Sequence, residues 1–290
     1  MEILTRAEFL SRGRVPLAVY RQAPQSTRGI HAHEFSELVL IYRGRARHVT
    51  EGEAYPVAAG DVFVITGQRR HGYDRPEDFC LVNVLFDLDA LPVPLFDLPS
   101  VPGFHALFAL EPEFRRQHGF GSRLRLDPAA LAAACALVDR LEAELRGARP
   151  GHAAMAVALF MQLVTDLARA YGATTVPASQ GLLRLGQVLC FLETRLAEPV
   201  TLDQLARLAG MSVPTLVRAF RRVTGHSPIQ YLIAHRVARA AELLRETDEP
   251  VAQVARRVGF DDANYFSRLF RRRHGRTPRA FRAATRVLPV

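Results

Sequence analysis

The sequence predicts an α+β protein of several domains, in which a β-domain is followed by helices only. Three observations support this fold class. Short apolar runs separated by turn residues extend to about residue 88, and helical periodicity takes over from residue 127. Residues 201–290 hold 17 arginines against seven acids, whereas the rest of the chain is almost neutral. A neutral body joined to an end of net charge +10 is typical of a protein with a nucleic-acid-binding module.

Residues 1–126 are expected to form the β-domain. The runs at 38–42, 61–65 and 80–86 are rich in β-branched and aromatic residues, with glycine-containing turns between them. Many short strands at such spacing predict a sandwich or a barrel. Five prolines fall within residues 89–126, and we expect an irregular connection there.

Two amphipathic helices are expected next, over residues 127–172. Asp127 and Pro128 are suited to the N-cap and the first helical position, and Pro150-Gly151 separates the two helices. These helices could pack on the β-domain or pair with a second copy of the chain. We favour pairing, and interpret 127–172 as a helical dimerisation segment. Small and polar residues predict a linker over 173–180, and residues 181–290 are helical by pattern.

Composition excludes several other classes of protein. All 38 basic residues are arginine, which rules out mechanisms that need a lysine Schiff base or a P-loop lysine. Cys80, Cys135 and Cys190 are odd in number and far apart, so neither disulfides nor a cysteine zinc site is supported. The N-terminal residues lack the pattern of a signal peptide, and no apolar run is long enough to cross a membrane. We expect a cytoplasmic protein with no membrane partner.

The basic end contains an internal repeat. Residues 205–211 match 254–260, and residues 218–228 match 268–278, with a spacing of 49 and then 50 residues. Each copy consists of a short helix, a glycine turn and a longer helix, which is the helix-turn-helix pattern. We place the two units at about 202–225 and 251–275. A helix between them could hold two recognition helices about 34 Å apart, one turn of DNA.

Residues 181–284 resemble the DNA-binding domain of AraC/XylS-type transcription regulators. The stretch with the strongest resemblance is Ala255-x-x-Val258-Gly259-Phe260-Asp261-Asp262-x-x-Tyr265-Phe266-Ser267-Arg268-x-Phe270-Arg271-Arg272-x-x-Gly275-x-Thr277-Pro278. The resemblance implies two helix-turn-helix units that enter two successive major grooves of double-stranded DNA, in a regulator that acts on RNA polymerase.

The same resemblance assigns roles along the two recognition helices. Arginine can pair with guanine and asparagine with adenine, whereas proline, valine and alanine can only make apolar contacts with bases. Base contacts are expected from Pro214, Val217, Arg218, Ala263, Asn264, Ser267 and Arg268. Phosphate contacts, which give affinity and salt dependence, are expected from Arg221, Arg222, Arg271, Arg272 and Arg273.

The β-domain carries a cluster of histidines. His31 and His33 alternate along a strand, Glu37 follows, and a hairpin return could bring His71 alongside. These four residues can hold a divalent metal, and their spacing resembles that of the cupin barrel. Three interpretations are open: a metal-dependent cupin enzyme, a sensor pocket for a small polar ligand, and a structural histidine network. The attached DNA-binding module favours the sensor pocket over an isomerase or oxygenase with a DNA-binding tail.

The region 31–88 more closely resembles the rhamnose-responsive activators of the AraC/XylS family. This resemblance implies a homodimeric activator that responds to a small sugar such as L-rhamnose and has no enzymatic activity. An architectural DNA binder that responds to no effector is a further alternative. The residues expected to bind the effector are His31, His33, Glu37, Arg45, His48, His71, Tyr73 and Asn83.

Overall fold

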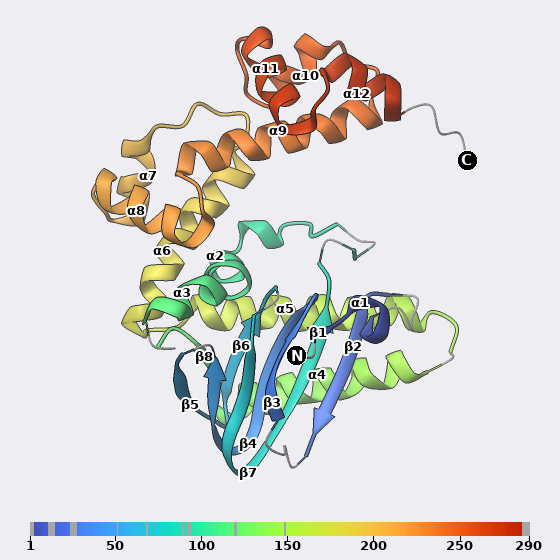
Figure 1. Ribbon diagram of the computed structural model, residues 1–290, viewed down its shortest axis with the longest axis vertical. Coiled ribbons are helices and arrows are strands. Elements are labelled where there is room, and N and C mark those ends of the chain that lie inside the picture. The colour runs from blue at the N-terminus through green and yellow to red at the C-terminus, as the bar shows by residue number, and fades with distance from the viewer. Residues whose placement is uncertain are drawn as a thin grey trace. The chain divides into compact units, whose positions relative to one another are not determined.

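The computed structural model (Figure 1) describes residues 3–10, 15–23, 28–50, 52–67, 69–88, 90–91, 94–118, 121–147 and 149–285. The chain forms two compact units, residues 1–186 and 187–290. The first unit contains a β-sheet with helices packed on it, and the second contains only helices among its described residues. The predicted α+β class is therefore confirmed.

The described strands of the first unit form one eight-stranded sheet. Its order is β1-β3-β7-β4-β6-β8, with β2 also paired to β7 and β5 to β4. All pairings are antiparallel except that of β1 with β3. The strands are β1 (Ile3–Leu4), β2 (Leu17–Gln22), β3 (Arg28–His33), β4 (Ser36–Thr50), β5 (Ala54–Ala58), β6 (Asp61–Ile65), β7 (His71–Phe86) and β8 (Leu124–Arg125), and a short helix α1 (Arg6–Phe9) follows β1.

The two longest strands curl the sheet into a barrel-like shape. The first half of β4 pairs with β6 and its second half with β5. The first half of β7 pairs with β3 and its second half with β2. The β4–β7 ladder shifts register between Ile41 and Arg47. Gly44 lies at this irregularity with φ +72°, and a Cβ there would be 2.2 Å from the Asp78 carbonyl oxygen. Only glycine permits that close approach, so the bend depends on it.

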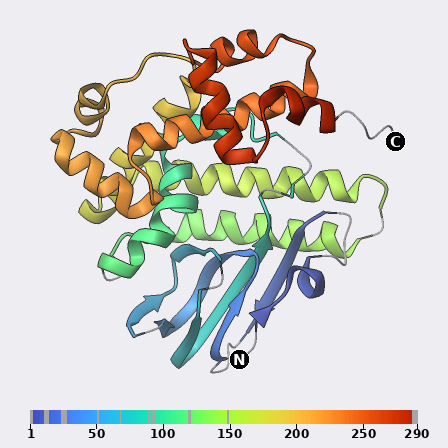
Figure 2. The ribbon, with the colours of Figure 1, turned by 45° about the horizontal axis from the view of Figure 1, so that its top comes forward.

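The sheet is apolar on both faces along its central strands. Alternate residues fill the inner core, to which β4, β5, β6 and β7 all contribute. The outer face is covered by α4 (Pro128–Arg146) and α5 (His152–Gly172), which lie side by side in Figure 2. Phe86 of β7 meets Phe160 of α5 with ring centroids 5.2 Å apart. The inner core consists of Val39, Ile41, Ala46, Tyr55, Val57, Phe63, Ile65, Tyr73, Phe79 and Leu81.

Helices α4 and α5 bury their apolar faces within their own chain. Leu137, Val138 and Leu141 of α4 are buried without a second copy, and Arg21 of β2 pairs with Glu142 of α4 at 2.7 Å. The apolar faces of α4 and α5 thus pack on the β-domain, which is one of the two arrangements that the sequence allowed. Dimerisation through other faces of these helices stays a prediction. Helix α5 also has the length and hydropathy of a membrane span, and nine of its residues are buried in this unit.

The stretch expected to be an irregular connection is largely helical, so that part of the prediction is wrong. It contains a 3₁₀ turn (Leu98–Ser100), α2 (Pro102–Phe104), a π-helical turn (His105–Leu110) and α3 (Glu111–His118). Pro99 and Pro102 do not interrupt these helices, because they occupy first-turn positions, where the missing N–H costs little.

The predicted linker also differs from the structure, because from Pro177 onward it belongs to helix α6 (Pro177–Thr194). Ser179 in its first turn is fully buried. Gly186 allows the helix to approach α2, since a Cβ there would lie 2.5 Å from the Pro102 carbonyl oxygen. The small and polar residues of 173–180 predict a linker, but Ser179 is packed in the interior, and Gly186, beyond that range, permits a close helix contact.

The second unit contains the two predicted helix-turn-helix motifs. Gly210 ends the first helix of one motif with φ +60°, and Gly259 stands in the corresponding turn of the other with φ +91°. Ser212 and Asp262 cap the second helices as expected. The helices are α7 (Leu202–Ala209), α8 (Val213–Thr224), α9 (Pro228–Glu246), α10 (Val251–Arg257), α11 (Ala263–His274) and α12 (Pro278–Thr285).

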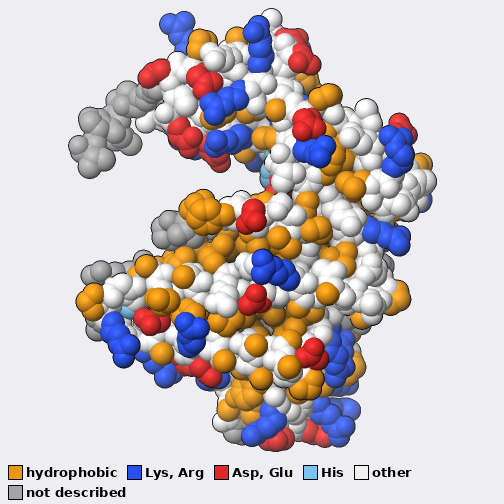
Figure 3. All heavy atoms as spheres, turned by 180° about the vertical axis from the view of Figure 1, so that it is seen from behind, with side chains coloured by type: hydrophobic (Ala, Val, Ile, Leu, Met, Phe, Trp, Pro, Cys, Tyr) orange, Lys and Arg blue, Asp and Glu red, His pale blue; other side chains and the backbone are white. Residues whose placement is uncertain are grey.

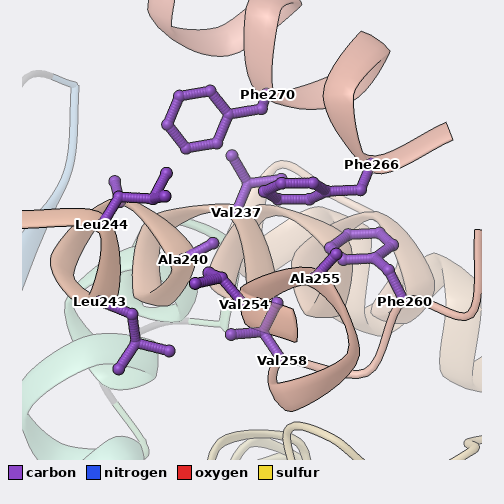
Figure 4. Close-up of a cluster of buried hydrophobic side chains, with 11 residues drawn as sticks. Val237, Ala240, Leu243, Leu244, Val254, Ala255, Val258, Phe260, Phe266 and Phe270 are labelled. Atoms are coloured by element: carbon purple, nitrogen blue, oxygen red, sulfur yellow. The ribbon is translucent and has the colours of Figure 1, made fainter. Parts of the chain in front are cut away.

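Each motif has its own apolar core. Leu205, Leu216 and Phe220 are fully buried in the first, and Phe266 and Phe270 in the second, where α9, α10 and α11 meet (Figure 4). The arginines of this unit lie outside these cores. On the face of the first unit drawn in Figure 3, basic and acidic side chains are interspersed among hydrophobic ones, in line with its near-neutral charge.

Candidate functional site

The predicted histidine cluster is present and lies on the inner face of the sheet. His31 of β3 pairs in register with His71 of β7, and their ring centroids are 4.4 Å apart. His33 Nε2 lies 2.9 Å from Glu37 Oε2, and His71 Nε2 lies 3.3 Å from the same oxygen. None of these four side chains is more than 5% exposed. The alternation of β3 and its antiparallel pairing with β7 bring them together, so the predicted convergence is present, although β3 and β7 do not form a hairpin.

Backbone carbonyl groups orient the three imidazole rings. Nδ1 of His31, His33 and His71 lies 3.2, 2.6 and 3.1 Å from the carbonyl oxygens of Gly29, Phe35 and Arg69, respectively. With a proton on Nδ1, a neutral ring presents a lone pair on Nε2, whereas an imidazolium donates from Nε2 as well. Burial would raise the pKa of the Glu37 carboxyl, but hydrogen bonds with His33 and His71 outweigh burial and hold that pKa well below its usual range.

His48 and Tyr73 extend the cluster along the inner face. Their rings lie 5.3 Å apart, and His48 also meets His71 at 5.9 Å. Burial, followed by the charges of His71 and Arg115, lowers the pKa of His48 well below its usual value, so its imidazole is neutral near pH 7. The Tyr73 hydroxyl is buried and has no hydrogen-bond partner among the described residues.

A cavity of about 310 Å³ opens beside this cluster. His48 and His71 form part of its wall, so the cavity and the histidine cluster are continuous. Histidine, arginine, threonine and tyrosine side chains supply polar groups, and Val64, Ile65 and Pro112 supply apolar surface. This mixture suits a small hydroxylated ligand, which needs directed hydrogen bonds and an apolar contact surface. The lining residues are His48, Thr50, Tyr55, Val64, Ile65, Arg69, Arg70, His71, Pro112 and Arg115.

Of the eight residues expected to bind an effector, His48 and His71 line the cavity. His31, His33, Glu37 and Tyr73 belong to the adjoining cluster, and Arg45 and Asn83 belong to neither. The structure does not bring Arg45 to the cavity: its side chain is 71% exposed and pairs with Glu77 across the β4–β7 ladder. The strand alternates, so when His48 faces inward, Arg45 faces outward. Asn83 lies opposite Val39 on the inner face but does not line the cavity, and its Oδ1 is buried without a partner among the described residues.

Sequence reasoning missed Tyr55, Thr50, Arg70 and Arg115. Tyr55 could have been found, because it alternates with Val57 along β5 and both face the inner core. Arg115 could not, because it lies on α3, in the stretch that was interpreted as irregular. Its guanidinium donates to the Val64 carbonyl at 2.7 Å, which holds α3 against the wall of the cavity.

In the second unit, α8 and α11 each present one polar face away from the core. Pro214, Arg218, Arg221 and Arg222 are exposed on α8, and Val217 is half-buried beside them. Residues at positions i, i+3, i+4, i+7 and i+8 lie on one side of a helix. The predicted base and phosphate contacts of the first motif therefore share one surface.

The corresponding face of α11 is formed by Asn264, Ser267, Arg268, Arg271 and Arg272. Arg268 lies over the ring of exposed Tyr265, 5.9 Å from its centroid, and this contact limits the orientations of its guanidinium. The Ser267 hydroxyl donates to the Ala263 carbonyl at 2.8 Å.

Two predicted contact residues of α11 are not part of this face. Ala263 packs partly against the core of the second motif, at the edge of the exposed surface. Arg273 is exposed but lies about half a turn from Asn264, so it is on the opposite side of the helix. We therefore leave Arg273 out of the candidate phosphate contacts.

Arg236 of α9 is a structural residue that the sequence did not indicate. Its guanidinium donates to the carbonyl oxygens of Leu196, Gly259 and Glu198 at 2.7, 2.8 and 2.7 Å. It thereby ties the linking helix to the segment before α7 and to the turn of the second motif. Desolvation lowers its pKa, with Asp261 opposing, but arginine is so basic that it stays charged.

Comparisons with known proteins agree with both parts of this architecture. Residues 16–164 match the AraC-like ligand binding domain, and residues 205–284 match a helix-turn-helix domain. The chain is 32% identical over 294 residues to an HTH-type transcriptional activator RhaS from Salmonella arizonae, with all of both chains covered. It is 33% identical to the RhaS of Citrobacter koseri, with 97% of each covered. It is 40% identical to the DNA-binding domain of AdpA, crystallised with a target DNA, over 36% of this chain and 93% of that one (TM-score 0.35).

The family matches define a DNA-binding transcription regulator with a ligand-binding domain. The chain belongs to the AraC family, and among the relatives that it matches over its whole length are the RhaS activators.

Proposed function

We propose that this chain is a cytoplasmic, homodimeric transcription activator that responds to a small sugar and acts on RNA polymerase. The observation that carries the proposal is a cavity with buried polar walls in the same chain as a double helix-turn-helix unit. Effector binding would shift a pre-existing equilibrium between states of the regulator by its difference in affinity for them.

A monosaccharide suits the cavity in both size and chemistry. Arginine and histidine side chains and the Tyr55 hydroxyl offer donors and acceptors at several angles, and Val64 and Ile65 offer apolar surface for a sugar ring. L-Rhamnose is the first sugar to test, because region 31–88 resembles rhamnose-responsive activators. His48 and His71 line the cavity and are the candidate contacts that the sequence had already indicated, and Tyr73 lies beside His48 in the adjoining cluster.

Calorimetric titration of the purified protein with a panel of monosaccharides tests the effector. We expect saturable binding of at least one sugar, at least a 10-fold loss in His48→Ala, and no change in Arg45→Ala. Arg45 is the matched control because it lies on the same strand but faces outward. A protein that binds none of the sugars, or an Arg45→Ala variant that loses binding, would contradict this assignment.

The DNA-binding surfaces are assigned to α8 and α11, which would enter two successive major grooves. Base contacts are proposed for Pro214, Val217, Arg218, Asn264, Ser267 and Arg268, with Ala263 at the edge. Phosphate contacts are proposed for Arg221, Arg222, Arg271 and Arg272. Arg272→Ala should weaken binding about equally on all sequences and reduce the salt slope by about 1, measured by fluorescence anisotropy. Arg273→Ala, on the opposite side of α11, should change neither quantity.

A divalent metal is a second candidate occupant of the histidine cluster. The ligand atoms of His31, Glu37 and His71 lie within 4.8 Å of one another. Nδ1 of both histidines faces a backbone carbonyl, as it does in most metal-ligating histidines, so the residues fit a first-row ion. Such an ion would supply a Lewis acid for hydroxyl oxygens of the effector. Metal content measured after purification, with Glu37→Gln as the comparison, tests this; sugar binding by metal-free protein would count against it.

A further inference from the structure

Arg115 connects the cavity to the interior of the first unit. Arg115 is one of the residues that line the cavity, and its guanidinium donates to the Val64 carbonyl and lies over the Phe63 ring, 4.9 Å from the centroid. It also forms an ion pair with Glu111, one turn earlier on α3. Its side chain is 7% exposed and that of Glu111 is fully buried. A ligand in the cavity therefore meets one end of a buried ion pair.

The polar chain continues from Glu111 into the helices. The Ser122 hydroxyl donates to Glu111 Oε1 at 3.4 Å. The Ser122 carbonyl accepts hydrogen bonds from the Tyr171 hydroxyl at 2.8 Å and from the Ser179 hydroxyl at 3.3 Å. Ser122, Tyr171 and Ser179 all have 0% exposure. An unbroken series of contacts thus runs from the cavity wall through α3 to the end of α5 and the first turn of α6.

Burial makes the members of this chain depend on one another. In a low-dielectric interior, hydrogen bonds are stronger and an unsatisfied polar group is costly. Removing one partner of a buried ion pair leaves an uncompensated charge, so Glu111 must find new donors when Arg115 moves. The donor nearest at hand is the Ser122 hydroxyl, which belongs to the residue that also holds α6.

Helix α6 is the element by which the chain leaves the first unit. The division between the two units, after Gly186, falls within this helix. Its first turn is held to the first unit by Ser179 and by Gln180 Nε2, which donates to the Thr174 carbonyl, and its third turn by close packing of Gly186 on Pro102. A change at Ser122 would therefore alter how firmly the first turns of α6 are held.

We propose that Arg115 senses the effector and that the chain Glu111–Ser122–Ser179 transmits its movement to the first turns of α6. This inference rests on the proposed function, in which the cavity binds a sugar. A sugar oxygen that accepts a hydrogen bond from Arg115 draws the guanidinium toward the cavity, and Glu111 then pairs more closely with Ser122. Binding thereby strengthens the attachment of α6, and Arg115 acts as a positioning residue for that helix.

Amide hydrogen exchange of the full-length protein tests the polar chain Glu111–Ser122–Ser179 without any ligand. Ser122→Ala removes the hydroxyl that contacts Glu111 but keeps the carbonyl that holds α6. We expect Ser122→Ala and Ser179→Ala each to speed exchange in residues 180–186 about 5-fold, the effect of losing one hydrogen bond. If they act through one chain, the double variant should exchange no more than about 2-fold faster than the faster single variant. Independent effects would multiply, and that result would overturn the proposal.

Thr165→Ala is the matched control, because the Thr165 hydroxyl donates to the Met161 carbonyl within α5 and takes no part in the chain. Alone, it should leave exchange over residues 180–186 within about 2-fold of the wild type. Arg115→Met combined with Ser179→Ala repeats the test from the cavity end, and the Ser122 pair decides it if Arg115→Met does not fold. An acceleration by Thr165→Ala equal to that by Ser122→Ala would also overturn the proposal.

A final measurement adds L-rhamnose as the probe. In the wild type we expect slower exchange over residues 180–186, and in Ser122→Ala we expect this slowing to be lost while sugar affinity stays within about 2-fold. Slowing that persists in Ser122→Ala would overturn the proposed chain. If the wild type does not bind L-rhamnose, the proposed effector fails, and the ligand-free double-variant result alone decides whether the chain exists.

Discussion

The two helix-turn-helix motifs of the second unit share a backbone design but differ in the chemistry that they offer to DNA. In both, a glycine with positive φ follows the first helix and a polar side chain caps the second. In α8 the first positions of the outer face are Pro214 and Val217, whereas α11 has Asn264 and Ser267 there. Among the proposed base contacts, Arg218 and Arg268 are the one equivalent pair with the same side chain.

This difference predicts a division of labour between the motifs. Apolar side chains can contact a thymine methyl group, but asparagine and arginine discriminate bases through paired hydrogen bonds. The second motif should therefore contribute more to sequence choice than the first. A duplicated fold can keep its geometry while its two recognition surfaces acquire different roles.

The motifs also differ in how their turns are held. A Cβ at Gly210 would meet open space, but a Cβ at Gly259 would lie 2.9 Å from the backbone of Ala197 and 2.8 Å from Arg236 Cζ. The second turn is thus packed against the segment before α7 and against the linking helix. The position of the second motif is fixed by tertiary contacts that the first motif lacks at the equivalent turn.

The largest expected effect comes from Gly259→Ala. The new methyl group would clash with backbone atoms and would also force an L-residue to φ +91°, so we expect a loss of about 4 kcal/mol in the free energy of unfolding. Gly210→Ala, which meets no atoms, should lose about 1 kcal/mol. Urea unfolding followed by circular dichroism measures both. Equal losses of unfolding free energy in Gly259→Ala and Gly210→Ala would contradict the proposed difference in packing between the two turns.

Arg236→Ala should have the next largest effect. It leaves three backbone carbonyls without the donor that they share, which costs about 3 kcal/mol of unfolding free energy at about 1 kcal/mol per bond. Arg239→Ala is the control, because this exposed arginine of the same helix pairs with Glu242 at the surface. Such a pair is worth less than about 1 kcal/mol. A loss in Arg236→Ala no larger than in Arg239→Ala would mean that the three bonds do not position the motif.

The difference in recognition can be tested at the two equivalent arginines. Arg268→Ala should cost about 1–3 kcal/mol in binding to the specific site and relax discrimination at one or two base pairs. Arg218→Ala should do the same at a different base pair, one turn of DNA away. Asn264→Ala should also reduce discrimination between base pairs, whereas Val217→Ala should leave it unchanged. Anisotropy titrations with a set of single-base variants of the operator measure this, and unchanged preference in Arg268→Ala would contradict its assignment as a base contact.

The second unit was predictable because its signals are local. Capping residues, glycine turns and helical periodicity at Leu216 and Phe220 depend on neighbours within a few residues, and the repeat displays each signal twice. Arg236 was not predictable, because its three partners are 23 to 40 residues away along the chain. No local pattern distinguishes it from the exposed arginines of the same helix.

The cavity was predictable only in part, for the same reason. Strand alternation places His31, His33 and His48 on the inner face, and the long-range pairing of β3 with β7 brings His71 to them. Arg45 was assigned to the pocket by its chemistry, although the register of β4 turns it outward. Arg115 reaches the cavity from a helix that packs against β6, and such tertiary packing leaves no periodic trace in the sequence.

The smallest expected difference between the motifs concerns their helix caps. Asp262 accepts hydrogen bonds from the backbone N–H groups of Tyr265 and Asn264, and these bonds lower the pKa of its carboxyl. Because that pKa is lower in the folded state, the ionised cap stabilises the fold above the ordinary value of the pKa. This contribution is lost as the pH falls through the folded value.

Ser212 carries no charge, so the cap of the first motif should not depend on pH. The gap in unfolding free energy between the wild type and Asp262→Asn should therefore be constant above about pH 5 and should shrink below about pH 4. The gap between the wild type and Ser212→Ala should stay constant over the same range. Unfolding curves at pH 3 to 7 distinguish the two caps. A gap for Asp262→Asn that persists unchanged at pH 3 would show that its charge does not stabilise α11.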